Sequence, residues 1–415
     1  MTDLAEMRDR YAELIVSHGL NVQEGQLVNI VAEACHRDFV MQVAEKAYGR
    51  GARFVNLDLI DLRANRLRIL HSKDGDLTYT PEYLPVKFKE LVDKNAANLR
   101  IIGSEDPDLL SDLDPKKMNT VRKQTYLAAR YFYEEGIGRA RVHWTVAAAA
   151  TPLWGRKLFG DLDPEAACAR LWEEIFCITR ADRPDCLEAW QRHNRTLQER
   201  ARRLTDMKIR ELHFSGPGTD LVVGLSDKAI FKGGGDQGPH GVEFEPNLPT
   251  EEVFTTPDSR ETRGQARATR PFLINGRMIE GLRVEFEDGR VSGFEAAAGE
   301  ETFREYIGSD EGASRLGEVA LVGVDSPVYR SGLVFEEILY DENAACHIAV
   351  GSAYKTCIEG GESMSKEELE AVGCNDSSAH TDMMISSEEV DVAATTHAGE
   401  RVPLIAKGRW VGEPA

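Results

Sequence analysis

Residues 27–59 read LVNIVAEACHRDFVMQVAEKAYGRGARFVNLDL, and this stretch decides the fold of the first half of the chain. The apolar run 27–32 predicts a strand, the helical spacing over 39–48 predicts a helix that ends near Gly51, and 54–59 predict another strand. A strand, a helix and a strand in so short a stretch form a βαβ unit, whose strands run parallel. The unit therefore predicts a parallel sheet.

The same alternation continues on both sides of this unit. Helices are predicted over 4–15, from Glu82, and over 115–133, 164–177 and 185–204, and strands over 99–102 and 142–147. We therefore expect residues 1–205 to form an α/β domain with an open, mainly parallel sheet.

The pattern of residues in the sequence changes after Lys208. Glycine becomes frequent, and short alternating runs separated by turn signals predict strands over 209–214, 221–225, 278–286 and 333–338. We expect residues 206–415 to form a strand-rich α+β domain, with the boundary near Thr205.

Composition and net charge favour some classes of protein and argue against others. The chain has 415 residues, 42% hydrophobic and 29% charged, which is typical of soluble globular proteins. The net charge of -20 lies entirely in residues 206–415, which argues against nucleic-acid binding and favours cationic ligands. No apolar run approaches the length of a membrane span. Seven cysteines without a C-x-x-C pattern, after a charged N-terminus, predict a reducing cytoplasmic location.

Histidines and carboxylates in apolar runs of the second half are the candidate chemical groups. His380 and Asp382 precede an apolar run that looks extended, so their side chains are expected on the same side of a strand. His36 and Asp38, with the same spacing, open a helix, where such side chains diverge. Each of these residues alone is more often structural. Glu251, Glu252, Glu318 and His347 complete a set of carboxylates and imidazoles that suits zinc, cobalt or manganese, and several carboxylates indicate two metals.

The sequence gives less support to nucleotide binding and to nucleophilic catalysis. Gly233-Gly234-Gly235-Asp236 lacks the phosphate-loop and dinucleotide-binding patterns, so a flexible turn is favoured over a nucleotide site. No G-x-S-x-G motif is present, and no cysteine has a recognisable catalytic context.

Five pieces of sequence, taken together, carry a resemblance to a known family. They are Gly218-Thr219-Asp220-Leu221, NLPTEEVFT at 247–255, Gly317-Glu318, HIAVGSAY at 347–354, and Ala379-His380-Thr381-Asp382. In this order and spacing they resemble the metallo-aminopeptidases of the aminopeptidase T and aminopeptidase S type, thermophilic aminopeptidases. With the βαβ opening, the resemblance covers nearly the whole chain.

The resemblance implies a centre of two divalent ions per subunit: zinc, cobalt, manganese or magnesium. By position, the ligands would be Glu252, Glu318, His347, His380 and Asp382, with Tyr354 as a catalytic partner. Glu252 or Glu318 would bridge the metals, and a water activated between them would attack the peptide bond. Glu318 or Glu251 would transfer the proton. The choice of Glu252 over Glu251 as ligand rests on spacing and stays open.

The resemblance also implies a function and an assembly. The substrates would be peptides with a free N-terminus, from which the N-terminal residue is hydrolysed. The family is dimeric, so a homodimer is expected, with residues 1–205 serving dimerisation and forming a cavity wall. The alternative is a non-catalytic metal- or peptide-binding protein of the same fold. The native metal and the preferred N-terminal residue stay open.

Overall fold

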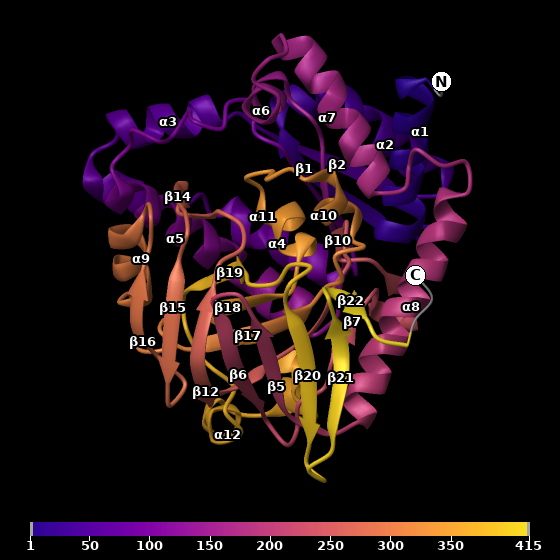
Figure 1. Cartoon of the computed structure of the whole chain (residues 1–415). Helices are drawn as coiled ribbons and strands as arrows, with labels where there is room; N and C mark the ends of the chain where they lie inside the picture. The colour runs from indigo at the N-terminus through magenta and orange to yellow at the C-terminus, as the bar shows by residue number, and fades with distance from the viewer. Residues whose placement is uncertain (1–2, 413–415) are drawn as a thin grey trace. The chain divides into compact units, whose positions relative to one another are not determined.

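The computed structural model describes residues 3–412 and divides them into two compact units (Figure 1). The first comprises the residues up to Gln191 and Gly235–Pro249, and the second comprises Arg192–Gly234 and the residues from Thr250 onward. This differs from the boundary expected near Thr205. Helix α8, Cys186–Asp206, runs across the division, and 235–249 joins the first unit because its strand β10, Asn247–Leu248, pairs with a strand of that unit.

The first unit contains the predicted parallel sheet. Its strand order is β10-β4-β3-β1-β2, and every pair in it is parallel. The strands preceding β10 are β1 (Leu27–Glu33), β2 (Phe54–Ile60), β3 (Ala97–Ile102) and β4 (His143–Ala148). The α/β class predicted from the βαβ stretch is confirmed.

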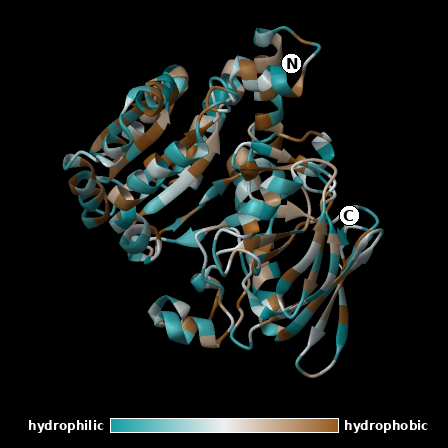
Figure 2. Cartoon of the chain, turned by 90° about the vertical axis from the view of Figure 1, so that its left-hand side faces the viewer, coloured by the Kyte–Doolittle hydropathy of each residue, from teal (hydrophilic) through white to brown (hydrophobic). Residues whose placement is uncertain are grey.

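Helices alternate with these strands. They are α1 (Leu4–Leu14), α2 (Arg37–Gly49), α3 (Leu62–His71), α4 (Tyr83–Asp93), α5 (Pro115–Tyr131), α6 (Pro152–Leu158) and α7 (Pro164–Ile178). Aspartate side chains cap the N-termini of α5 and α7, each followed by a proline in the first turn. Tyr11 of α1 stacks on Phe39 of α2 at a centroid distance of 5.7 Å, and both are buried. Figure 2 shows apolar residues along the strands and on one side of several helices.

The second unit is strand-rich, as predicted, and contains a larger and a smaller antiparallel sheet. The larger has the order β16-β15-β12-β6-β5-β20-β21-β22, and the smaller β19-β18-β17-β11-β7. The larger comprises β5 (Ile209–Gly216), β6 (Thr219–Leu225), β12 (Pro257–Arg267), β15 (Arg283–Glu287), β16 (Arg290–Glu295), β20 (Asp391–Thr396), β21 (Arg401–Ala406) and β22 (Arg409–Trp410). The smaller comprises β7 (Lys232–Gly233), β11 (Val253–Thr255), β17 (Leu316–Leu321), β18 (His347–Gly351) and β19 (His380–Met384).

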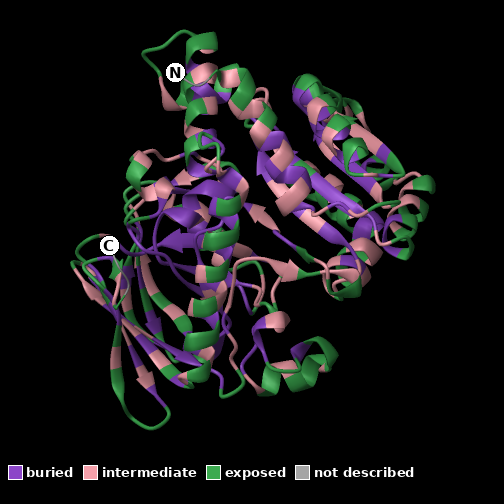
Figure 3. Ribbon diagram, turned by 90° about the vertical axis from the view of Figure 1, so that its right-hand side faces the viewer, coloured by how far each residue is buried: buried purple, intermediate pink, exposed green. Residues whose placement is uncertain are grey.

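One face of the smaller sheet packs into the apolar core of this unit. Val319, Ile348 and Met383 belong to a buried cluster that also contains Phe214 and Val223 of the larger sheet. Because side chains alternate along a strand, the neighbours of the first three residues point to the opposite face. That face therefore carries Glu318, His347 and Asp382. Figure 3 shows the contrast between buried strands and the exposed tip of the β20–β21 hairpin.

Two local predictions differ from the structure. Residues 333–338 were predicted as a strand, but they form a loop that leads into helix α11, Ile338–Asp341. The carboxylate of Asp341 accepts hydrogen bonds from the backbone N–H groups of Phe335 and Glu337, so this backbone is satisfied without a strand partner. The predicted strand 278–286 is interrupted: β14, Arg277–Ile279, ends before β15 begins.

The remaining helices of the second unit are α9 (Glu300–Ile307), α10 (Pro327–Ser331) and α12 (Lys366–Ala371). Among the described residues, no helix has both the length and the apolar character needed to cross a membrane.

Candidate metal centre

The smaller sheet places four of the expected ligands by its strand pairing. Glu318 of β17 and Asp382 of β19 both pair with Ala349 of β18, so the two carboxylates flank a small residue in one row across the sheet. His347 and His380 lie two residues before Ala349 and Asp382 on their strands, and residues two apart share a face. The strand pairing therefore places four of the expected ligands on one face.

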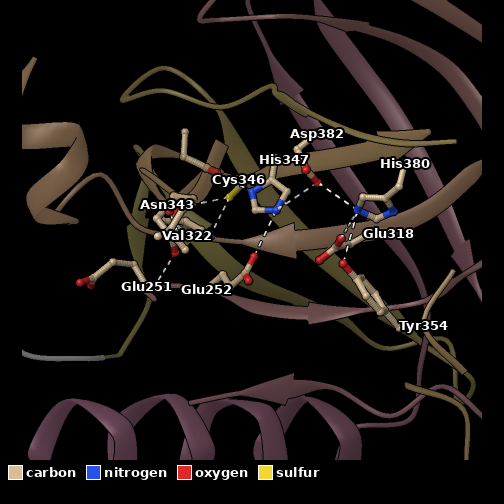
Figure 4. A network of polar contacts seen from close by, with 12 residues as sticks. Glu251, Glu252, Glu318, Val322, Asn343, Cys346, His347, Tyr354, His380 and Asp382 are labelled. Carbon is tan, nitrogen blue, oxygen red and sulfur yellow. Dashed lines mark hydrogen bonds and ion pairs between the residues drawn. The ribbon is translucent and has the colours of Figure 1, made fainter. Parts of the chain in front are cut away.

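Glu252 reaches the same face from the next strand. It directly precedes β11, where Val253 pairs with Leu321. Val253 and its partner Leu321 point to the same face of the sheet. Glu318, three residues before Leu321, points to the opposite face, and so does Glu252, which directly precedes Val253. We call Glu252, Glu318, His347, His380 and Asp382 the metal centre (Figure 4).

The two imidazoles lie close to the carboxylates. The Nε2 atom of His347 lies 3.1 Å from Glu252 Oε2 and 4.0 Å from Asp382 Oδ1. The Nε2 atom of His380 lies 3.3 Å from Glu318 Oε2 and 3.6 Å from the same Asp382 oxygen. Asp382 Oδ1 is therefore close to both histidines.

Backbone carbonyls orient both histidine rings. His347 Nδ1 lies 3.2 Å from the carbonyl oxygen of Ala345, and His380 Nδ1 lies 2.9 Å from that of Ser352. A carbonyl only accepts, so in the neutral ring each Nδ1 carries the proton and Nε2 keeps its lone pair for a metal. Both Nε2 atoms face the carboxylates.

Burial and charge act together on the titration of these groups. Burial and the neighbouring carboxylates raise the pKa of Glu318 to about 7 against the effect of His380. Burial alone would lower the pKa of His347, but contact with Glu252 and the charge of Asp382 raise it well above its usual value. The carboxylates of the centre therefore form a concentrated negative charge, which bound cations would stabilise.

The donor set fits divalent metal ions. Two groups have ligand atoms within 4.8 Å of one another: Glu252, Glu318 and His347 form the first, and Glu318, His380 and Asp382 form the second. Glu252 Oε2 is buried and accepts no hydrogen bond from any residue in 3–412. A buried carboxylate oxygen without a donor is costly unless a cation compensates it.

Tyr354 lies at the edge of this cluster. Its hydroxyl oxygen is 3.5 Å from His380 Nε2, and its ring contacts those of Phe254 and His380 edge-on. The Thr256 hydroxyl accepts a hydrogen bond from the backbone N–H of Tyr354 and donates one to its carbonyl oxygen. Burial and the nearby carboxylates Glu318 and Asp382 raise the pKa of Tyr354 well above its usual value, so the hydroxyl stays protonated and can donate.

Glu251 does not join the cluster. Its Oε2 atom lies 3.5 Å from His193 Nε2 on α8, and it belongs to neither ligand group (Figure 4). Consecutive side chains in an extended chain point in opposite directions, so a chain that turns Glu252 toward the metal centre turns Glu251 away. Of the two adjacent glutamates, Glu252 has the position of a ligand, and the geometry gives no support to Glu251 as the proton-transfer group.

Two residues that the sequence analysis did not single out border the centre. Asn343 is fully buried, and its side-chain oxygen accepts a hydrogen bond of 2.7 Å from the backbone N–H of Glu251. Its amide nitrogen donates to Leu339 O at 2.9 Å. The other residue is Glu342. Polar residues directly before the apolar run 344–350 were the available signal for both.

Asn343 is expected to hold the segment that carries Glu252. Replacing Asn343 with alanine leaves the buried N–H of Glu251 without its acceptor, which costs about 1–3 kcal/mol. Urea unfolding of chelator-treated protein measures this loss without a contribution from bound metal. Asn119→Ala, an exposed helical site, is the matched control, with an expected change within about 0.5 kcal/mol. Equal unfolding midpoints for both variants would contradict the role of Asn343.

Comparison with known proteins agrees with this geometry. The model of a family described as thermophilic metalloprotease (M29) matches residues 5–410. Aminopeptidase 2 of Geobacillus stearothermophilus is 40% identical over 98% of both chains. Aminopeptidase T of Thermus thermophilus is 41% identical over 97% of this chain and 98% of its own. The solved structure of wild-type AmpT from Thermus thermophilus superimposes with a TM-score of 0.92, covering 99% of this chain and 100% of that one. The resemblance inferred from five short pieces is confirmed, and the chain belongs to the M29 family of thermophilic metalloproteases.

Proposed function

We propose that this chain hydrolyses the N-terminal residue from peptides at a centre of two divalent ions. Membership of the M29 family and the aminopeptidases among its relatives make it a metallo-aminopeptidase. The observation that supports two ions is that Glu318 belongs to both ligand groups. A carboxylate shared between two sets of ligands is suited to bridge a pair of metals.

The proposed ligands divide between the two groups. Glu252 and His347 would hold one ion, His380 and Asp382 the other, and Glu318 both. Bound divalent ions supply Lewis acidity, which lowers the pKa of water and polarises a carbonyl group. Oxygen and imidazole ligands suit zinc, cobalt, manganese and, with fewer nitrogens, magnesium.

Two side chains of the protein would handle charge and protons. The protonated hydroxyl of Tyr354 would donate a hydrogen bond to the oxyanion that develops from the scissile carbonyl. Of the two candidates for proton transfer, only Glu318 faces the centre. Glu318 would take up a proton from water and pass it to the leaving amine.

Metal removal tests this function directly. Hydrolysis of leucine p-nitroanilide should disappear after dialysis against a chelator and return when divalent metal is added. Elemental analysis of the reconstituted protein should find two ions per chain. N-acetyl-leucine p-nitroanilide, which lacks a free amine, should stay intact and is the substrate control for an exopeptidase.

Two results would count against the proposal. Full activity in excess chelator after prolonged dialysis would rule out a metal-dependent reaction. Two bound metals without cleavage, across a panel of N-terminal residues, would instead favour a non-catalytic metal- or peptide-binding protein of this fold.

A further inference from the structure

His380 lies at the edge of the smaller sheet, where the sheet alone does not fix its position. It is the first residue of β19, and β19 stands at one end of the strand order, next to β18. His347 lies on β18, which has a neighbouring strand on each side. The side chain of His380 is 27% exposed, whereas that of His347 is 1% exposed. Contacts from outside the sheet must therefore hold His380 in place.

A carboxylate in the turn after helix α9 holds the chain just before His380. This chain segment is neither helix nor strand. The carboxylate of Asp310 accepts hydrogen bonds of 2.8 Å from the hydroxyl of Ser377 and from both the hydroxyl and the backbone N–H of Ser378. The Ser377 hydroxyl oxygen in turn accepts a hydrogen bond of 3.0 Å from the N–H of Ala379. One carboxylate therefore fixes the three residues that lead into β19.

Asp310 is itself held by its own turn. Its Oδ1 atom accepts hydrogen bonds of 3.0 and 2.9 Å from the N–H groups of Gly312 and Ala313. The turn packs so closely that a Cβ atom at Gly312 would collide with the carbonyl oxygen of Asp376. Burial alone would raise the pKa of Asp310, but hydrogen bonds, first that from the N–H of Ser378, lower it below its usual value. The turn therefore presents an ionised acceptor at a fixed place.

Helix α9 makes a second contact, directly with His380. The hydroxyl oxygen of Tyr306, near the end of α9, accepts a hydrogen bond of 2.8 Å from the backbone N–H of His380. The ring is held separately, because its Nδ1 atom lies 2.9 Å from the carbonyl oxygen of Ser352. With its backbone and Nδ1 both held, His380 directs Nε2 toward Glu318 and Asp382 (Figure 4).

We infer that Asp310 and Tyr306 are positioning residues, which set the direction from which His380 Nε2 meets its metal ion. This inference rests on the proposed two-metal function. Neither residue is a ligand, because neither belongs to the two ligand groups. Residues that orient a metal ligand contribute about 10–100-fold to metal affinity. Loss of either contact should therefore weaken the ion that His380 binds and leave the other ion in place.

Cobalt titrations of the metal-free protein measure this effect without turnover. The visible absorption bands of bound Co²⁺ report the geometry of its ligands, and competition with a chelator gives the affinity of each ion. We expect the unaltered protein to bind two ions. Asp310→Asn and Tyr306→Phe should each weaken one of them by about 10–100-fold and change its absorption bands. Asp310→Glu, which keeps the charge, should recover part of the affinity.

A double-mutant cycle tests whether the effect passes through His380. In a His380→Ala background, adding Asp310→Asn should leave the affinity of the remaining ion unchanged, because the residue through which Asp310 acts is absent. Asp391→Asn is the matched control. The carboxylate of Asp391 also accepts a backbone hydrogen bond, 2.7 Å long and from the N–H of Lys407, but it lies outside the metal centre. This control should bind both ions as the unaltered protein does.

Urea unfolding of the chelator-treated variants separates positioning from stability. Equal cobalt affinities in the unaltered protein, Asp310→Asn and Tyr306→Phe would overturn the inference, even with lower unfolding midpoints in the variants. Equal weakening of both ions would overturn it as well, because a general loosening of the fold does not single out His380. Failure of the proposed function is a separate result: the unaltered protein would leave leucine p-nitroanilide intact, even where Asp310→Asn weakens one of two ions.

Discussion

Replacing His347 with alanine is expected to remove one of the two proposed metal ions and nearly all peptidase activity. His347 is fully buried, and its Nε2 atom is the only imidazole nitrogen in the first ligand group. Without it, Glu252 and Glu318 lose a ligand partner, and no imidazole shields their charges from each other in that group. Changes in residues that only support metal ligands cost roughly 10–100-fold in affinity or activity, so loss of a direct ligand should exceed about 100-fold in both.

Elemental analysis after dialysis and kcat/KM for leucine p-nitroanilide measure the two effects. His397→Ala is the matched control, because His397 is partly exposed and lies outside the metal centre, with its Nε2 atom 3.3 Å from Asp227 Oδ1. It should keep both ions and the full rate. If His347→Ala retained two tightly bound ions, His347 would not be a ligand, and the proposed division of the ligands into two groups would be wrong.

Much of the architecture was predictable because it follows from local patterns. The stretch 27–59 contains complete strand, helix and strand signals, and the parallel pairing of β1 with β2 follows from their connection through α2. The prediction failed at 333–338, where apolar residues suggest a strand. There the side chain of Asp341 satisfies the backbone instead, and such a contact leaves no periodic signal. The strand β10 was also missed, because two residues far along the chain complete the first sheet through tertiary pairing.

The site was predictable to the extent that alternation along strands governs it. The spacing of His380 and Asp382 predicts a shared face, and the structure shows them on β19 with Nε2 and Oδ1 3.6 Å apart. The choice between Glu251 and Glu252 depends on which face of β11 meets the core, which the adjacent pair EE does not reveal. Glu342 opens a short 3-10 helix, Glu342–Ala344, which leaves no periodic signal in the sequence. The expected homodimer depends on a second chain and stays a prediction.

Replacing Tyr354 with phenylalanine should separate catalysis from metal binding. The variant keeps the ring, and with it the edge-on contacts to Phe254 and His380, but loses the hydroxyl. No ligand is altered, so two ions should remain, and KM should change little. Loss of a preorganised donor to an oxyanion costs about 100- to 1,000-fold in kcat, so the reduction should appear in kcat alone.

The direction of this effect follows from the charges around the hydroxyl. Burial and the surrounding carboxylates raise the pKa of Tyr354, which favours the protonated hydroxyl that a donor requires. A donor that acts only as negative charge develops stabilises the transition state more than the bound substrate, which is the condition for a pure kcat effect. Tyr79→Phe, at an exposed position of the first unit, is the matched control and should be fully active. An unchanged kcat in Tyr354→Phe would show that the oxyanion is stabilised without this hydroxyl, and a loss of metal would show that Tyr354 acts through the ligands.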